Sequence, residues 1–229
     1  ISIGAINAAI IAGNKPGTRV ARLRTFWETV SSGLQGTSLA AEGHGRTLFN
    51  DASSWLATVF GIPGFFSPRP VAPVLAWPGT EAALSYYDTT PLRATLAELV
   101  DFKQLNHGGI RTSLGAVQVR TGNFRYFDTR RETLRVEHIM ASGALPPGFP
   151  PVMIGDQPYW DGGLVSNTPL QYVVDEENAG QDLCIFQVDL FSARGAMPRT
   201  IMEVAEREKE IRFSSRTRMN TTMEKDLHD

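Results

Sequence analysis

The chain has 229 residues, 42% of them hydrophobic and 20% charged, and its net charge at pH 7 is -2. This size and composition predict one large domain with a full core, and the slightly acidic balance lacks the positive field that nucleic-acid binding requires. One cysteine excludes an internal disulfide framework, and the four histidines lack the spacing of a zinc site. No stretch of 18 apolar residues is free of proline and polar breaks, so we expect no membrane span.

Two helices are expected at the start of the chain. Residues 4–13, GAINAAIIAG, are typical of a buried helix that is closed by Gly13 and then by Pro16. Residues 19–31 predict a more amphipathic helix. Its apolar side carries Val20, Leu23, Phe26, Trp27 and Val30.

The segment between residues 33 and 79 is rich in glycine, proline and aromatic residues. From Trp55 to Gly79 its only charged residue is Arg69, and its prolines forbid a long helix. The segment is either a cap packed over the core or a mobile lid near a substrate entrance. As a lid it could enter a lipid interface, although basic residues for anionic lipid are sparse there. The side chains available for that contact are Phe60, Phe65, Phe66 and Trp77.

Regular structure is expected to return after this segment. Thr90 can cap a helix that has Pro91 in its first turn and runs to about Val100. The stretch IRTSLGAVQVRTGNFRYFDT predicts two strands joined at Gly122 and Asn123, which tolerate a positive φ. VEHIMASGA then predicts a short helix before a proline-dense loop.

The C-terminal part adds a helix over residues 169–175, a strand and a final charged helix from about residue 200. The strand is DLCIFQVDL, residues 182–190, whose nearly continuous apolar character is typical of the middle of a parallel sheet. Cys184 in this run is expected to be a buried structural thiol. The alternation of helices and buried strands predicts the α/β class.

Ser2-Ile3-Gly4 matches the second half of G-x-S-x-G, the nucleophile elbow in which a strand turns sharply into a helix. In an elbow the serine is exposed at the turn, and the helix N-terminus stabilises a developing oxyanion. The alternative is that Ser2 is an ordinary N-cap of the first helix.

Asp161 is a second candidate, because YWDGGLVSNTPL places it before Gly162 and Gly163 in a predicted loop between hydrophobic segments. A carboxylate there can be held by backbone N–H groups and still reach a neighbouring group. The alternative is a tight Asp-Gly turn stabilised by an Asx hydrogen bond.

These motifs resemble the patatin-like phospholipases. SIGAINAA is similar to the family's elbow and its small-residue helix, and ASGALPPGFPPVMIGDQPYWDGGLVSNTPL is similar to its downstream Asp-Gly-Gly block. YYDTTPLRATL and EIRFSSRTRMNTT resemble a bacterial subgroup with an extra C-terminal helical region. The resemblance implies a three-layer α/β/α domain with a mostly parallel central sheet over residues 1–195, and the start of the helical region over residues 196–229.

The resemblance also implies the roles of individual residues. Ser2 is the expected nucleophile and Asp161 the expected general base of a Ser-Asp dyad, while Gly162 and Gly163 shape the loop of the base and Gly4 permits a close elbow. The oxyanion loop is expected upstream of residue 1, so that the chain is interpreted as a fragment missing both ends and nearly inactive by itself.

The function implied for the intact parent is a serine lipid acyl hydrolase that needs no cofactor. Its expected substrate is a lipid or another acyl ester, and its expected location is the cytoplasm with possible peripheral membrane contact. Two other functions stay open: a carboxylesterase or thioesterase for soluble substrates, and a catalytically silent scaffold. A Ser2–Asp161–His228 triad is disfavoured because His228 lies in a charged terminal segment, and His138 is expected on a helix surface or satisfied in the core.

Overall fold

The computed structural model describes residues 1–31, 57–176 and 184–228, and of residues 176 and 215–228 it describes only the backbone. The chain forms two compact units. One is Ser2–Asp161, and the other consists of Ile1 with Gly162–Asp229. Both residues of the expected dyad lie in the first unit.

The sheet of the first unit is antiparallel throughout its described strands. Its strand order is β4-β3-β6-β5. The bounds of the strands are Ser113–Gln118 (β3), Phe124–Asp128 (β4), Val152–Ile154 (β5) and Gln157–Asp161 (β6). Two tight turns impose the β3–β4 and β5–β6 pairings, because a chain that reverses within a few residues can only pair antiparallel. Gly122 (φ 72°) and Gly155 (φ 62°) supply the positive φ in these turns.

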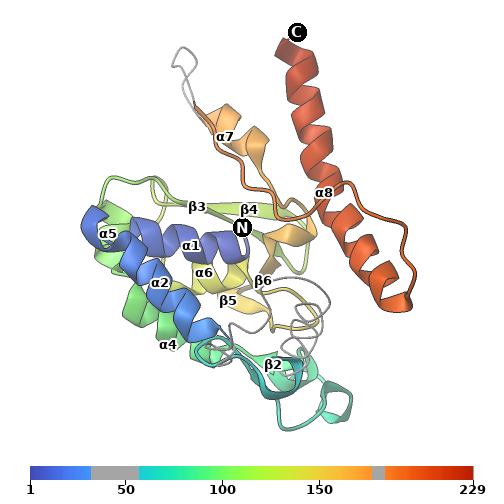
Figure 1. Cartoon of the computed structure of the whole chain (residues 1–229). Coiled ribbons are helices and arrows are strands. Elements are labelled where there is room, and N and C mark those ends of the chain that lie inside the picture. Colours follow the sequence, from blue (N-terminus) through green and yellow to red (C-terminus); the bar gives the residue numbers. More distant parts are fainter. Residues whose placement is uncertain (32–56, 177–183, 229) are drawn as a thin grey trace, which may run out of the picture. The chain divides into compact units, whose positions relative to one another are not determined.

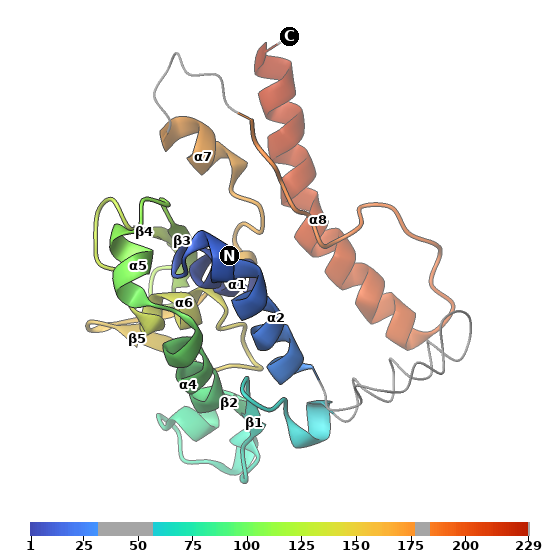
Figure 2. The same ribbon diagram turned by 60° about the vertical axis from the view of Figure 1, so that its left-hand side comes forward.

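Helices cover this sheet in successive layers, as Figures 1 and 2 show. The helix α6 (Val136–Ser142) packs against β3, β5 and β6. Outside it, α1 (Ile3–Ala12) contacts α6, α2 (Arg19–Val30), α4 (Thr90–Leu99) and α5 (Phe102–His107). The buried side of α1 consists of small and branched residues, namely Ala5, Ile6, Ala9, Ile10 and Ala12.

Most expected helices and the expected hairpin are confirmed, with local differences. The helix α4 includes Thr90 as its first residue, so the N-cap position falls on Thr89 and not on Thr90 as predicted. Before it, Asp88 Oδ1 accepts a hydrogen bond from Thr90 N at 2.9 Å. On the expected apolar side of α2, Phe26 is buried whereas Val20 and Trp27 are exposed.

The α/β class is confirmed, but two expectations about the sheet are wrong. The mostly parallel sheet is not found, since every described pairing is antiparallel. The strand expected over residues 182–190 is absent from residues 184–190, which are exposed and pair with no described strand. An apolar run becomes a strand only where neighbours accept its backbone hydrogen bonds. Cys184 is consequently exposed rather than buried.

The proline-rich segment is described only from residue 57 onward, so its part over residues 33–56 lies outside the described chain. Its short elements are β1 (Ser67–Pro68), η2 (Pro73–Leu75), η3 (Glu81–Ala83) and β2 (Tyr87–Asp88). Phe65 and Phe66 pack against Phe149, with ring centroids 5.9 and 5.3 Å away. This half of the segment is therefore a packed cap, whereas Phe60 and Trp77 are exposed.

The second unit contains η4 (Gly162–Leu164), the predicted helix α7 (Leu170–Glu176) and the predicted charged helix α8 (Ile201–His228). Within α8 the apolar residues Ile201, Val204 and Ile211 are exposed. Among the described residues, no helix is both long and apolar enough to cross a membrane.

Close packing makes Gly13, at the end of α1, a position where even a methyl group should destabilise the fold. A Cβ there would lie 2.7 Å from Val100 Cγ1 and 2.8 Å from the carbonyl oxygen of Ala9. We expect Gly13→Ala to lower the free energy of unfolding by about 1–3 kcal/mol in chemical denaturation. Gly17→Ala is the matched control, since a Cβ there meets no described atom within 4 Å. Equal stability of the two variants would contradict this packing argument.

Candidate active site

The backbone of Ser2 is strained. Its φ is 52° and its ψ is -134°, and among the described residues it is the only non-glycine residue with a positive φ. Such a conformation costs about 1–3 kcal/mol and persists only where the surrounding structure imposes it. Residues of this kind cluster at functional sites. The strain therefore favours the elbow interpretation of Ser2.

The alternative interpretation, an ordinary N-cap, does not fit the geometry of Ser2. An N-cap serine has an extended backbone, and its hydroxyl accepts a hydrogen bond from the first turn of the helix. Ser2 has neither property, because its backbone is in the positive-φ region and its side chain makes no capping hydrogen bond. The carbonyl of Ser2 instead accepts from Ala5 N at 2.9 Å and starts α1. The hydroxyl is thus not used to begin the helix.

Main-chain hydrogen bonds hold Ser2 and Asp161 on one short segment, residues 142–144, which we call the anchor segment. The N–H of Ser2 donates to the carbonyl of Ser142 at 2.9 Å. The N–H of Asp161 donates to the carbonyl of Ala144, also at 2.9 Å. Two residues that are remote in sequence are thereby fixed to neighbouring points of the chain.

A further bond ties the anchor segment to the sheet. The hydroxyl of Ser142 is fully buried and donates to the carbonyl of Gly115 in β3 at 2.7 Å. The next residue, Ala116, pairs with Asp161 of β6. The anchor segment is therefore bonded to β3, β3 is paired with Asp161, and Asp161 is bonded back to the anchor segment. Ser2 is joined to this ring of hydrogen bonds at Ser142.

Asp161 lies at the end of a strand and not in the loop that the sequence predicted. It is the last residue of β6, and only 1% of it is exposed. The β5–β6 hairpin that carries it was not expected from the sequence. The position holds the backbone of Asp161 by sheet pairing, which is more rigid than an Asx turn.

The expected glycines differ in their surroundings. Gly162 and Gly163 begin η4 directly after Asp161, and Gly162 is buried. A Cβ at Gly4 would meet no described atom within 4 Å, and Gly4 is exposed. The structure thus shows no close approach of the chain to Gly4. No described residue fills the space next to Gly4 in the first turn of α1.

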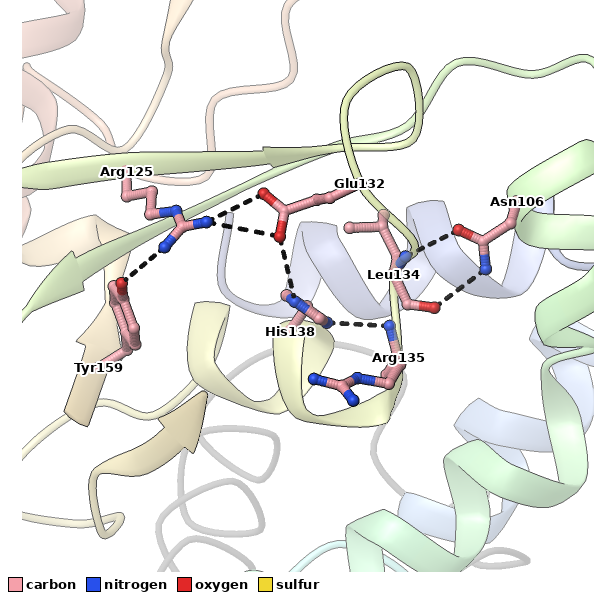
Figure 3. A network of polar contacts seen from close by, with 7 residues as sticks. All are labelled: Asn106, Arg125, Glu132, Leu134, Arg135, His138 and Tyr159. Atoms are coloured by element: carbon pink, nitrogen blue, oxygen red, sulfur yellow. Dashed lines mark hydrogen bonds and ion pairs between the residues drawn. The ribbon is translucent and has the colours of Figure 1, made fainter. Parts of the chain in front are cut away.

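His138 belongs to a buried polar network at the opposite end of α6 from the anchor segment (Figure 3). Its Nδ1 accepts a hydrogen bond from Arg135 N at 2.9 Å, so the neutral ring carries its proton on Nε2. Nε2 faces Glu132 Oε2 at 3.6 Å. His138 is only 2% exposed. Of the two alternatives given by the sequence, a helix-surface residue and a core residue with its hydrogen bonds satisfied, the second agrees with this burial; a catalytic base does not.

The same network ties several elements together. Arg125 of β4 donates from Nη1 to the hydroxyl of Tyr159 at 3.1 Å and from Nη2 to Glu132 Oε1 at 3.2 Å. Asn106 of α5 accepts from Leu134 N at 2.7 Å and donates to the carbonyl of Leu134 at 2.9 Å. These bonds fix the loop before α6, and hence the start of the helix that ends at the anchor segment.

His228 lies in α8 at a position whose side chain is outside the described part, and Cys184 is in the second unit. In the described ranges, no group of three or more His, Cys, Asp or Glu side chains could hold a metal ion. The arrangement around Ser2 and Asp161 is one of a hydroxyl at a strained turn and a buried carboxylate, which is suited to nucleophilic catalysis.

Sequence reasoning missed the residues of the anchor segment. Ser142 and Ala144 lie in ASGALPP, which resembled the family block, but nothing in that stretch indicated a contact with Ser2. Their role depends on carbonyl groups that any residue carries. Only the packing of α6 against α1 and β6 makes it visible.

Comparison with known proteins agrees with the resemblance noted from the motifs. A family model described as patatin-like phospholipase matches residues 1–174. That range includes Ser2, the anchor segment and Asp161. A search of curated proteins finds no match to the chain.

Burial lowers the pKa of His138 below its ordinary value of 6.5, an effect that the nearby Glu132 only partly offsets. As pH falls, His138 is therefore protonated at a higher pH in the unfolded chain than in the folded chain. Stability linked to His138 is complete above pH 6.5 and is lost as pH falls from there toward the lowered pKa of the folded state. We expect urea titrations of the wild type to show this loss and His138→Gln to lack it. His107→Gln, at an exposed position, is the control, and a wild-type pH dependence in His138→Gln would contradict the assignment.

Proposed function

The chain belongs to the patatin-like phospholipase family, and we propose that it acts within this family of lipid acyl hydrolases through a Ser2–Asp161 dyad. One observation carries the proposal: the strained elbow at Ser2 is hydrogen-bonded to the same anchor segment as Asp161. A structural N-cap would need neither the strain nor the shared anchor. The substrate class is an acyl ester of a lipid.

In the proposed reaction, Ser2 Oγ attacks the carbonyl carbon of the ester, and its proton passes to the carboxylate of Asp161. The bond from the acyl carbon to the alcohol oxygen then breaks, and the alcohol leaves with that proton. Water repeats the sequence on the acyl-serine and releases the fatty acid. A hydroxyl needs such a base because it is a weak nucleophile in its protonated form.

The start of α1 supports this chemistry. In an elbow the N–H of the residue after the nucleophile, here Ile3, points at the developing oxyanion. A helix leaves its first N–H groups without intrahelical partners and has a partial positive charge at this end. The first turn of α1 contains no acidic residue that would oppose this charge. The open space at Gly4 lets an acyl group approach the same turn.

We also propose that the protein works in the cytoplasm with peripheral contact to membrane lipid. The family acts on lipid substrates, which are presented in aggregated surfaces. The proposed contact is peripheral because it needs only exposed apolar side chains and no spanning helix.

The dyad predicts that two different substitutions abolish the same activity in the full-length gene product. Ser2→Ala should remove labelling by a fluorophosphonate probe altogether. Asp161→Asn should lower ester hydrolysis by about 10²–10⁴-fold, because the proton acceptor is lost while the shape is kept. Hydrolysis of phospholipid and of a short-chain soluble ester measures both effects.

Matched controls are Ser31→Ala and Asp156→Asn, which change exposed residues and should leave the rates unchanged. Full activity in a folded Ser2→Ala protein would refute the dyad. Hydrolysis of soluble esters without any action on phospholipid would identify a carboxylesterase or thioesterase instead. A folded wild-type protein that the probe does not label would identify a silent scaffold.

A further inference from the structure

The loop between β1 and β2, residues 69–86, exposes large apolar side chains at its far end. Val74 is 86% exposed, Leu75 77% and Trp77 81%. They lie in and directly after η2, which contacts η3 across the loop. Isolated apolar residues on a surface are ordinary, but large apolar side chains that are close together in the chain and all strongly exposed make a candidate binding surface. We call residues 71–84 the apolar loop.

The charge of this region restricts what can bind it. From residue 57 to residue 87 the only charged residues are Arg69 and Glu81. Arg69 is turned inward, where its Nε donates to Ser85 Oγ at 3.1 Å, while Glu81 is exposed. The apolar loop therefore presents no exposed cation to an anionic surface. It complements an apolar layer with an electrically neutral boundary.

The base of the loop is held firmly. Strands β1 and β2 pair antiparallel, and Tyr86 and Tyr87 donate from their N–H groups to the carbonyls of Pro147 and Gly148. These carbonyls follow the anchor segment closely in the chain. The apolar loop is thus attached to the same part of the first unit that positions Ser2 and Asp161; it lies beside the label β2 in Figure 1.

We propose that the apolar loop docks the protein on a zwitterionic phospholipid surface by inserting Val74, Leu75 and Trp77. The inference rests on the proposed function, because a lipid acyl hydrolase has to reach a substrate that is held in an aggregate. Tryptophan prefers the headgroup level, and aliphatic side chains beside it bury apolar area in the acyl boundary. The firm base of the loop allows this contact to orient the active site.

Vesicle binding tests the docking surface separately from catalysis. The Ser2→Ala protein is sedimented with phosphatidylcholine vesicles, which it cannot hydrolyse. Adding Val74→Ser, Leu75→Ser and Trp77→Ser should weaken binding at least about tenfold, since three inserted apolar groups are lost. Adding Val20→Ser, a 71% exposed position on α2, should leave binding unchanged.

Three outcomes would overturn the docking surface. The first is that the Ser2→Ala protein does not bind the vesicles. The second is that the triple variant binds them as well as the Ser2→Ala protein does. The third is that the protein is a dimer, which the triple substitution dissociates without affecting vesicle binding. With Ser2 intact, the triple variant should keep hydrolysis of a soluble ester and lose hydrolysis of vesicle lipid. Vesicle binding through the loop without any ester hydrolysis would refute the proposed function and leave the docking surface standing.

A separate observation assigns a role to Ser142. Its carbonyl accepts the N–H of the strained Ser2, and its own hydroxyl is bonded to Gly115 O in β3. A Cβ at the next residue, Gly143, would come within 3.9 Å of the backbone of Ser2. We infer that Ser142 is a positioning residue, which holds the elbow in register with the sheet strand that pairs with Asp161. This inference also rests on the proposed function.

The test compares the rate of acylation per folded molecule with stability. In Ser142→Ala, fluorophosphonate acylation of Ser2 and kcat for a soluble ester should fall at least about tenfold, with KM within about twofold. Ser142→Cys, which keeps the size with a weaker donor, should be intermediate. Ser85→Ala is the control for loss of a buried hydroxyl away from Ser2. It removes the bond to Tyr87 O at 2.9 Å and also the bond accepted from Arg69 Nε at 3.1 Å, so its cost in stability should be at least as large.

A structural role alone would lower stability in both Ser142→Ala and Ser85→Ala and leave both acylation rates per folded molecule unchanged, which would overturn the assignment. Loss of the rate in both variants would overturn it as well. A wild-type protein that the probe does not label would refute the dyad and the positioning role together, whereas a labelled wild type with an equally labelled Ser142→Ala would refute only the latter.

Discussion

The arrangement of the site depends on the hydrogen bond from Ser2 N–H to the carbonyl of Ser142. A serine with a positive φ relaxes unless its neighbours hold it, and the strain involved is comparable to the strength of one or two hydrogen bonds. On the other side, the buried face of α1 fixes the helix that Ser2 begins. The elbow is thus held between a carbonyl and a packed helix, and neither contact uses the serine hydroxyl.

The two ends of the short helix α6 make different contacts, one with a polar network and the other with the candidate site. Its first turn is fixed by the polar network of the buried His138 and the partly exposed Glu132. Its last residue, Ser142, begins the segment that holds Ser2 and Asp161. Between these two ends, α6 packs against β3, β5 and β6 and against α1. Stability of the network and geometry of the site are therefore linked through one rigid element.

The sequence was most informative where local chemistry decides the structure. The small residues and closing Gly13 predicted α1, and Gly122 predicted the β3–β4 turn, because both signals act over a few residues. The tight turn at Ser2 was predicted for the same reason, and the positive φ of Ser2 agrees with it. The hydrogen bonds to the carbonyls of Gly115 and Ala144 could not be predicted from the sequence, since they use backbone carbonyls and depend on the register of β6 against β3.

The errors follow from long-range partners. Residues 182–190 have the composition of a central strand, yet composition cannot supply the neighbouring strand that such a segment needs, and Cys184 is exposed as a result. Asp161 was placed in a loop because Asp-Gly-Gly usually forms a turn, whereas pairing with Ala116 of β3 extends the strand up to Asp161 itself.

In the proline-rich segment, one side chain that is distant in sequence separates aromatic residues that pack against it from one that stays exposed. By composition alone, Phe65, Phe66 and Trp77 are equivalent candidates for contact with lipid. Phe149, from the loop after the anchor segment, packs against the two phenylalanines and draws that half of the segment onto the core. Trp77 lies beyond a proline-rich turn that has no such partner among the described residues, and it stays exposed. The loop that carries Phe149 also accepts the backbone hydrogen bonds of Tyr86 and Tyr87 at the base of the exposed half. One short segment therefore packs against one half of the proline-rich segment and holds the base of the other.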